Sequence, residues 1–293
     1  MSVIQNRKIW YAISLILLLA GFISLGIQGF NKGIDFTSGN VLQIEFEDVI
    51  STQQVEAVLD AQGLTGYSIQ AAGDGSDYII RTKEMTEAQN RELLAAFEEK
   101  LGELTVKQNQ KVGAVIGREL TRNAIMALAI ASVLMIIYIS FRFQAAYGIV
   151  AILALLHDVL VTAGLFSIFQ IEIDSTFVAA LLTIVGYSIN NTIVIFDRIR
   201  ENLSFDKKLP FDVLVDNSIK QTLVRCINTA MTVIFALLAL IFLGGATTKL
   251  FALALLTGTV VGTYSSILIS TSLLYDFQTK VFANFKVKHA NAR

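Results

Sequence analysis

Long stretches without a charged side chain constrain this chain more than any other feature of its sequence. The clearest runs from Asp174 to Asp197, with no Asp, Glu, Lys, Arg or His in between. A helix of that length, rising about 1.5 Å per residue, reaches across the hydrocarbon core of a bilayer. Only 16% of the residues are charged and 54% are hydrophobic, whereas a soluble domain has about 25% charged residues. The sequence therefore predicts an α-helical membrane protein.

The charges that flank six apolar segments set the limits of six predicted transmembrane helices. Each segment meets the roughly 20 residues that a spanning helix needs, the second with least to spare. The first is longer than the apolar region of a signal peptide, so we expect it to remain as a helix. The predicted spans lie in 1–30, which includes the N-terminus, and in 119–141, 143–171, 175–197, 225–246 and 249–276.

The distribution of Lys and Arg predicts the orientation of these spans. If the N-terminus lies inside, most basic residues near span ends fall on the inner side, and the two short outer connections hold only Lys249. Cytoplasmic loops of membrane proteins carry such an excess of basic residues. Both termini are therefore expected in the cytoplasm, including the tail 277–293, where His289 lies.

The segment 31–118 has a different character and predicts a small extracytoplasmic α+β domain. Strand-like alternation and helix-like spacing of apolar residues follow one another in the order β-α-β-β-α-β, the split βαβ pattern of ferredoxin-like domains. The residues Gly73-Asp74-Gly75-Ser76 favour a hairpin turn between the two central strands. The predicted elements are strand 41–46, helix 51–62, strands 66–72 and 78–82, helix 85–101 and strand 104–108.

The segment 204–224 predicts a short amphipathic helix on the cytoplasmic side. Pro210 suits the first turn of a helix, and Phe211, Leu214, Val215 and Ile219 then form one apolar stripe. Such a helix lies at the membrane interface and leads into the fifth span. A simple linker helix explains the pattern equally well.

The sixth span carries a ridge of small residues at every fourth position. Gly258, Gly262 and Ser266 are its centre, with Ala254 and Ser270 at its ends. Small residues at this spacing let two helices approach closely in lipid. We expect the ridge to pack within the chain; a ridge that faces a partner is the alternative.

The sequence offers no constellation of catalytic residues. It has two histidines and the single cysteine Cys226, with no phosphate-binding glycine loop and no His or Cys cluster for a metal. We expect no enzyme activity, no cofactor, no metal and no nucleic-acid partner.

Polar residues inside the predicted spans are the better candidates for function. His157 and Asp158 lie near the middle of the third span, and Asn190 and Asn191 lie within the fourth. Polar groups at this depth face a bundle interior or a wet cavity and often mark an ion path. A neutral Asp158 that bonds a neighbouring helix is the alternative. Arg225, at the start of the fifth span, is either part of such a path or an interfacial anchor.

Seven short motifs, in this order along nearly the whole chain, make the sequence resemble the SecF subunits of the SecD/SecF family. No single motif is decisive, but their order around a one-plus-five arrangement of spans makes the resemblance specific. They are Gly33-Ile34-Asp35-Phe36-Thr37, His157-Asp158-Val159, Ile171-Glu172-Ile173-Asp174, Val185-Gly186-Tyr187-Ser188-Ile189-Asn190, Asp197-Arg198-Ile199-Arg200-Glu201-Asn202, Gln221-Thr222-Leu223 with Arg225, and Gly244-Gly245.

This resemblance implies a six-span half of an RND-type (resistance–nodulation–division) assembly in the inner membrane of a bacterial cell. Such a half pairs with SecD, associates with the SecYEG channel and a YidC-type insertase, and acts on the exported polypeptide. The pair uses the proton-motive force to promote movement of that polypeptide. Two alternatives stay open: half of an RND efflux carrier for lipids or small hydrophobic molecules, and a scaffold subunit that couples to nothing.

The chain departs from the family pattern at Asn191. Family members commonly have Asp at this position, facing an Arg that corresponds to Arg225. A carboxamide cannot take up and release a proton at any relevant pH. The favoured explanation is that a carboxylate of SecD carries the proton while Asn191 gives hydrogen-bonding support. The alternatives are that Asp158 or another acid substitutes, or that coupling is reduced or uses another ion. A smaller departure is Ser38, where the family often has glycine.

Overall fold

The computed structural model describes residues 2–37, 39–72, 75–112, 114–142, 145–205 and 209–282. Two compact units make up the chain. We call Met1–Asn31 together with Ala127–Arg293 the helix bundle, and Lys32–Met126 the α+β unit. The predicted turn residues Gly73 and Asp74, the departure at Ser38 and the tail with His289 lie outside the described residues.

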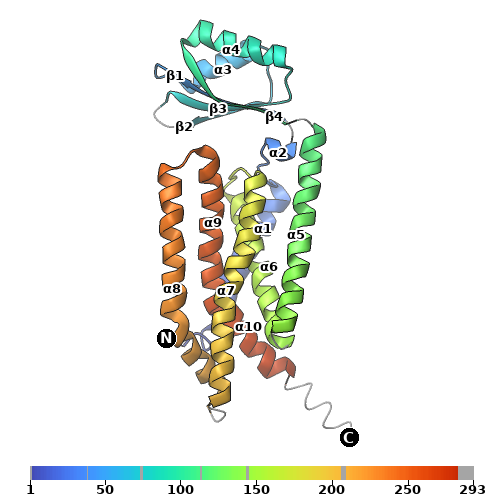
Figure 1. Cartoon of the computed structure of the whole chain (residues 1–293), viewed down its shortest axis with the longest axis vertical. Coiled ribbons are helices and arrows are strands. Elements are labelled where there is room, and N and C mark those ends of the chain that lie inside the picture. Colours follow the sequence, from blue (N-terminus) through green and yellow to red (C-terminus); the bar gives the residue numbers. More distant parts are fainter. Residues whose placement is uncertain are drawn as a thin grey trace. The chain divides into compact units, whose positions relative to one another are not determined.

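Long helices form the bundle (Figure 1). Within the described residues, five segments are long and apolar enough to cross a membrane: Arg7–Ile27, Ala146–Ile168, Ser175–Phe205, Phe211–Leu243 and Thr248–Thr279. The chain is thus a helical protein with five candidate spans. The helices are α1 (Arg7–Ile27), α5 (Ala114–Arg142), α6 (Ala145–Ile168), α7 (Ser175–Phe205), α8 (Phe211–Leu243), α9 (Ala246–Tyr264) and α10 (Ser270–Asp276), with π-helical turns η1 (Ser265–Ile269) and η2 (Phe277–Phe282).

Two details of the bundle differ from the sequence-based expectation. The segments 204–224 and 225–246 were predicted as an interfacial helix and a span, but Phe211–Leu243 is one continuous helix that begins after Pro210. No glycine or proline lies between Phe211 and Leu243, so nothing in the backbone interrupts the helix. The last span instead contains the π-helical turn η1 between α9 and α10.

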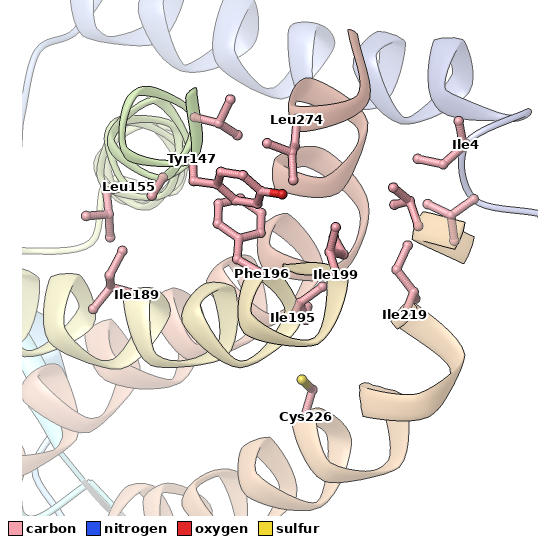
Figure 2. Close-up of a cluster of buried hydrophobic side chains, with 14 of the residues drawn as sticks. Ile4, Tyr147, Leu155, Ile189, Ile195, Phe196, Ile199, Ile219, Cys226 and Leu274 are labelled. Atoms are coloured by element: carbon pink, nitrogen blue, oxygen red, sulfur yellow. The ribbon is translucent and has the colours of Figure 1, made fainter. Parts of the chain in front are cut away.

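One cluster of buried apolar side chains joins the N-terminal segment to α6, α7, α8 and α10. Tyr147 and Phe196 form its aromatic centre, with ring centroids 5.4 Å apart in an edge-to-face arrangement. Figure 2 shows Ile4 and Ile219 at one side of this cluster and Leu155 with Ile189 at the other. The cluster brings residues from both ends of the sequence into one core.

The first residues of the chain are held by a carboxylate more than 200 positions away. Asp216 in α8 accepts hydrogen bonds from the backbone N–H of Val3 at 2.9 Å and of Ile4 at 3.1 Å, and from the Ser2 hydroxyl. Ile4 is only 1% exposed. The N-terminal segment is therefore a packed part of the bundle.

The α+β unit contains one four-stranded sheet in the order β2-β3-β1-β4, and all three pairings are antiparallel. Helices and strands alternate along the chain as β-α-β-β-α-β, as predicted, after the short helix α2 (Ile34–Thr37). The elements are β1 (Gly39–Phe46), α3 (Thr52–Ala61), β2 (Ser68–Ala72), β3 (Asp77–Thr82), α4 (Glu87–Leu101) and β4 (Leu104–Val112).

Local sequence explains where these two helices begin and end. Ser51 and Thr86 each form a capping box, with Gln54 and Gln89 as the reciprocal partners. Gly102 follows α4 with φ of 97°, a backbone conformation that favours glycine. Ser51 is the first residue of the predicted helix 51–62 and caps α3, and Thr86 is a cap that the sequence analysis did not single out.

The core of the α+β unit is apolar, and its surface carries ion pairs. Phe46 packs edge-to-face on Phe97, with centroids 6.1 Å apart. On the surface, the Lys107 ammonium lies 3.0 Å from a Glu45 oxygen and 3.1 Å from an Asp77 oxygen. Hydrogen bonds to Glu45 and then Asp77 raise the pKa of Lys107 above its ordinary value.

Candidate functional site

A buried acid–imidazole pair lies near the middle of α6. His157 Nδ1 is 2.9 Å from Asp158 Oδ1, and the Ser188 hydroxyl of α7 donates to Asp158 Oδ2 at 2.5 Å. Asp158 is 0% exposed and His157 is 7% exposed. Burying a carboxylate in an apolar region is costly unless partners satisfy it. The geometry supplies those partners from the same helix and from α7. We call His157 and Asp158 the dyad.

A chain of hydrogen bonds extends from the dyad to two further helices. His157 Nε2 is 3.0 Å from the Ser14 hydroxyl of α1, and that hydroxyl is 3.1 Å from the Tyr264 hydroxyl of α9. Tyr264 in turn donates to the backbone carbonyl of Trp10 at 3.1 Å. Four helices thus meet through polar groups inside the bundle.

A second polar contact joins α7 to the π-helical turn η1. The Ser266 hydroxyl donates to the Ser188 carbonyl at 3.2 Å and lies 2.9 Å from the Thr192 hydroxyl. All three residues are 0–1% exposed. This contact lies directly beside the dyad, because Ser188 also donates to Asp158.

The glycines of the predicted ridge explain why α7 and α9 approach so closely. A Cβ added to Gly262 would lie 2.9 Å from the Ser188 Cβ, and one added to Gly258 would overlap the side chain of Ile184. Side chains larger than hydrogen are therefore excluded where these two helices cross. In the structure, the ridge of Gly258, Gly262 and Ser266 packs against α7 of the same chain.

The remaining predicted site residues lie apart from the dyad. Asn191 is 3% exposed, and its Nδ2 has no hydrogen-bond partner among the described residues. Asn190, next to it in α7, is exposed. Arg225 is exposed on α8 and forms no ion pair with a described residue. Within the described part of the chain, no hydrogen bond links Asn191 to Arg225.

Two features of the bundle were missed by the sequence analysis. Ser14 and Tyr264 were not singled out, although each is a polar side chain within an otherwise apolar segment. Gly21 of α1 and Gly164 of α6 face each other so closely that a Cβ on Gly21 would lie 2.9 Å from the Gly164 Cα. Both are single positions on different helices, and pairing them requires the fold.

The chemistry that this site offers is proton binding and hydrogen bonding. Among the described residues there is no group of three or more His, Cys, Asp or Glu side chains that could hold a metal ion. The dyad combines a carboxylate with an imidazole, which are the two side chains most used to hold and pass a proton near neutral pH.

The fold and the site together define a multi-pass helical membrane protein with a polar interior and a small α+β unit. The family model described as "Protein export membrane protein SecD/SecF, C-terminal" matches residues 93–280, and that of the "SecD/SecF GG Motif" matches residues 23–48. The chain belongs to the SecD/SecF family of protein export membrane proteins.

Relatives of similar length carry a common name. The protein translocase subunit SecF of Sebaldella termitidis is 40% identical over 280 residues, which cover 94% of this chain and 91% of the relative. That of Vibrio alginolyticus is 37% identical and covers 91% of this chain and 86% of the relative. These names are those of translocase subunits, which supports the expectation that the chain is not an enzyme.

A solved structure shares the fold. The crystal structure of SecDF from Thermus thermophilus, described as a translocon-associated membrane protein, aligns with a TM-score of 0.88 and 35% identity. The alignment covers 96% of this chain and 39% of that one, so this chain spans about two fifths of the SecDF chain. A second SecDF structure, in a super-membrane-facing form, aligns with a TM-score of 0.73.

Proposed function

We propose that the chain is an auxiliary subunit of the Sec protein export machinery, pairs with SecD, and couples the proton-motive force to the movement of polypeptide. The single observation that carries the proposal is the match to SecDF over 96% of this chain. In the Thermus thermophilus SecDF protein, a region 38% identical to this chain occupies 38% of a longer polypeptide. A separate SecD chain would supply the equivalent of the rest.

The proposed membrane arrangement has six spans, with α5 as the second. The support is that α5 is a 29-residue helix that covers the predicted range 119–141. The α+β unit would be a ferredoxin-like domain outside the cytoplasm, because its strand order β2-β3-β1-β4 is that of a split βαβ fold. Both termini would then be cytoplasmic, in agreement with the distribution of Lys and Arg. The membrane would be the inner membrane of a bacterium.

Partners beyond SecD follow from the same proposal. The chain would associate with the SecYEG channel and a YidC-type insertase, and would act on the exported polypeptide. Moving one unit charge across the membrane releases about 2.3 kcal/mol per 100 mV. Few charges are therefore enough to bias a movement of the α+β unit.

In this proposal Asn191 supports the proton path without carrying the proton. Asn191 is buried in α7, and its Nδ2 is free among the described residues to bond a partner group. The carboxylate that carries the proton would belong to SecD, with Asp158 as the alternative within this chain. Asn191→Asp is then expected to raise proton-dependent export or leave it unchanged. A clear loss of export would contradict this role, and Asn190→Asp, on the exposed side of the same helix, is the matched control.

The experiment that tests the proposal is export of a secreted precursor in cells depleted of this chain, with the proton gradient intact or collapsed. A gradient-coupled subunit predicts that depletion slows export only while the gradient is present. Equal slowing in both conditions would instead indicate a scaffold. No effect in either condition would favour half of an efflux carrier, and transport of a lipid-like substrate would then be measured.

A further inference from the structure

We propose that the dyad of His157 and Asp158 holds one proton more than a neutral imidazole and a carboxylate would, and that loss of this proton reverses a hydrogen-bond chain connecting α6 to α1 and α9. The proposal rests on counting donors along that chain. It deepens the proposed function, because it identifies a proton-binding site in a subunit whose Asn191 cannot titrate.

The count starts at Tyr264, the far end of the hydrogen-bond chain, where it is fixed which group donates. A carbonyl oxygen only accepts, so the Tyr264 hydroxyl gives its one proton to the Trp10 carbonyl, 3.1 Å away. The bond between Tyr264 and Ser14, at 3.1 Å, then needs its proton from Ser14. Ser14 has no second proton to give to His157 Nε2 at 3.0 Å. His157 must therefore donate through Nε2–H.

This direction decides what the dyad contains. With a proton on Nε2, a neutral imidazole has a bare lone pair on Nδ1, which faces Asp158 Oδ1 at 2.9 Å. Two lone pairs do not attract at that distance, so a proton lies between these atoms. Either imidazolium faces carboxylate, or neutral imidazole faces a protonated carboxyl group. In both cases the net charge of the dyad is zero.

Burial supports the same conclusion independently of the donor count. Asp158 is 0% exposed and His157 is 7% exposed, and an unneutralised carboxylate at such a place is costly. The Ser188 hydroxyl, at 2.5 Å from Oδ2, satisfies one carboxyl oxygen but brings no positive charge. The extra proton removes the net charge that the fold would otherwise bury.

Loss of the proton requires the donors and acceptors along the hydrogen-bond chain to exchange roles. His157 would keep a proton on Nδ1 to donate to the ionised Asp158, and Nε2 would become an acceptor. Ser14 would then donate to Nε2, and Tyr264 would donate to Ser14. The hydrogen bond from the Tyr264 hydroxyl to the Trp10 carbonyl would then break. One proton thus changes contacts on α1 and α9, although Ser14 lies 143 positions from His157 and Trp10 lies 254 positions from Tyr264 in the sequence.

The helices that pack around the dyad carry titratable groups of their own. Tyr264 of α9 is in the chain itself, with its ring centroid 6.4 Å from that of His157. Nearer the N-terminus of α1, Tyr11 donates to Asp276 of α10 at 3.1 Å, and Asp276 also pairs with Arg7 at 3.3 Å. Arg7 of α1 and Asp276 of α10 are therefore paired with each other.

The direct test is ¹⁵N NMR of the histidine ring in the purified full-length chain. His289→Gln leaves His157 as the sole histidine, so one labelled residue reports on the dyad. Near neutral pH we expect the signal of an Nε2 that carries a proton. A lone pair on Nε2 together with N–H on Nδ1 would overturn the proposal. This readout does not involve export, so it stands or fails separately from the proposed function.

The reversal is tested by titration of Tyr264→Phe in the same background. Without the Tyr264 hydroxyl, Ser14 is free to donate to Nε2, so at the pH where wild type is half converted we expect a several-fold smaller fraction with Nε2–H. Tyr138→Phe is the matched control, since Tyr138 of α5 is 52% exposed, and should titrate as wild type. An unchanged titration in Tyr264→Phe, or no change of tautomer in wild type while it stays folded, would refute the reversal.

Discussion

The helix bundle and the α+β unit differ in how they distribute polar and apolar side chains between interior and surface. In the α+β unit the buried cluster is apolar, with Phe46 at 2% and Phe97 at 0% exposure. In the bundle, residues that are 0% exposed include Asp158 and a set of hydroxyl side chains, while Ile16 is 65% and Phe242 is 76% exposed. The buried hydroxyl residues at 0% are Thr162, Ser167, Ser218, Ser265, Ser266, Ser270, Thr271 and Ser272.

The difference follows from the surroundings for which each unit is built. In water, removal of apolar surface from solvent drives folding, so the unit Lys32–Met126 gathers its large side chains inside. In lipid, apolar surface gains little from meeting another helix, and close packing of small residues and hydrogen bonds holds helices together. Substitutions of buried residues in the two units should therefore change stability by different amounts and for different physical reasons.

The largest effect is expected for Phe97→Ala in the α+β unit. Phe97 is fully buried and packs against Phe46, so its removal leaves a cavity that costs about 3–5 kcal/mol. Hydrogen exchange of peptides from β1 and α4 would measure the local loss. Val49→Ala, at a position 77% exposed, should leave exchange unchanged. Equal protection in Phe97→Ala would show that this core contributes little to the stability of the unit.

A smaller loss is expected for Asp158→Leu in the bundle, despite the larger change in chemistry. The substitution leaves His157 Nδ1 and the Ser188 hydroxyl without their partner, which costs about 1–3 kcal/mol. Thermal unfolding in detergent would measure it. Asp158→Asn retains groups that can bond both neighbours and should lose less than Asp158→Leu. Greater stability in Asp158→Leu would mean that the polar interior is kept for function at the expense of stability.

A still smaller loss is expected for Gly258→Ala, which tests the contact between α7 and α9. The new methyl group overlaps the Ile184 side chain, and its accommodation costs about 1–2 kcal/mol. Gly26→Ala in α1 is the matched control, because no atom lies within 4 Å of the added Cβ. That control should be neutral or slightly stabilising in the same unfolding assay. Equal stability of the two variants would show that close packing of α7 on α9 contributes little to the stability of the bundle.

The smallest effect is expected for Lys107→Met on the surface of the α+β unit. Exposed ion pairs contribute about 0–1 kcal/mol, and salt screens them. Because the pKa of Lys107 is raised in the folded protein, its contribution is present below the pKa of the unfolded chain and is lost as pH rises through the folded value. Wild type and Lys107→Met should therefore converge in stability at high pH. A gap that widens with pH would contradict this assignment.

Much of the fold could be predicted from the sequence where a local pattern decides the structure. The alternation in β1, the cap at Ser51 and the small-residue ridge on the last span each act over a few residues, and each is found in the structure. The continuity of α8 was not predicted, because Arg225 marked the predicted start of a span. Charged residues set where a membrane ends and leave the helix backbone free to continue.

The candidate site could be predicted only in part. His157, Asp158 and Asn191 stand out because ionisable and amide groups are rare in apolar segments. Ser14 and Tyr264 could not be found in this way, since a serine or tyrosine in a span is common and acquires a role only through its partner. Ser14 lies 143 positions from His157 and 250 positions from Tyr264 in the sequence. Only the fold shows that they meet.

The carboxylate of Asp216 also sets an order of events during synthesis of the chain. Val3 and Ile4 leave the ribosome before most of the bundle is made, and the side chain that accepts their N–H groups is made 213 and 212 positions later. At about 5–20 residues per second, the wait is on the order of tens of seconds. During that time α1 is already made, while its leading segment has no docking site. Val3 and Ile4 are thus fixed in place only after much of the bundle has been made, and any factor that occupies this nascent segment has to release it before the bundle can close.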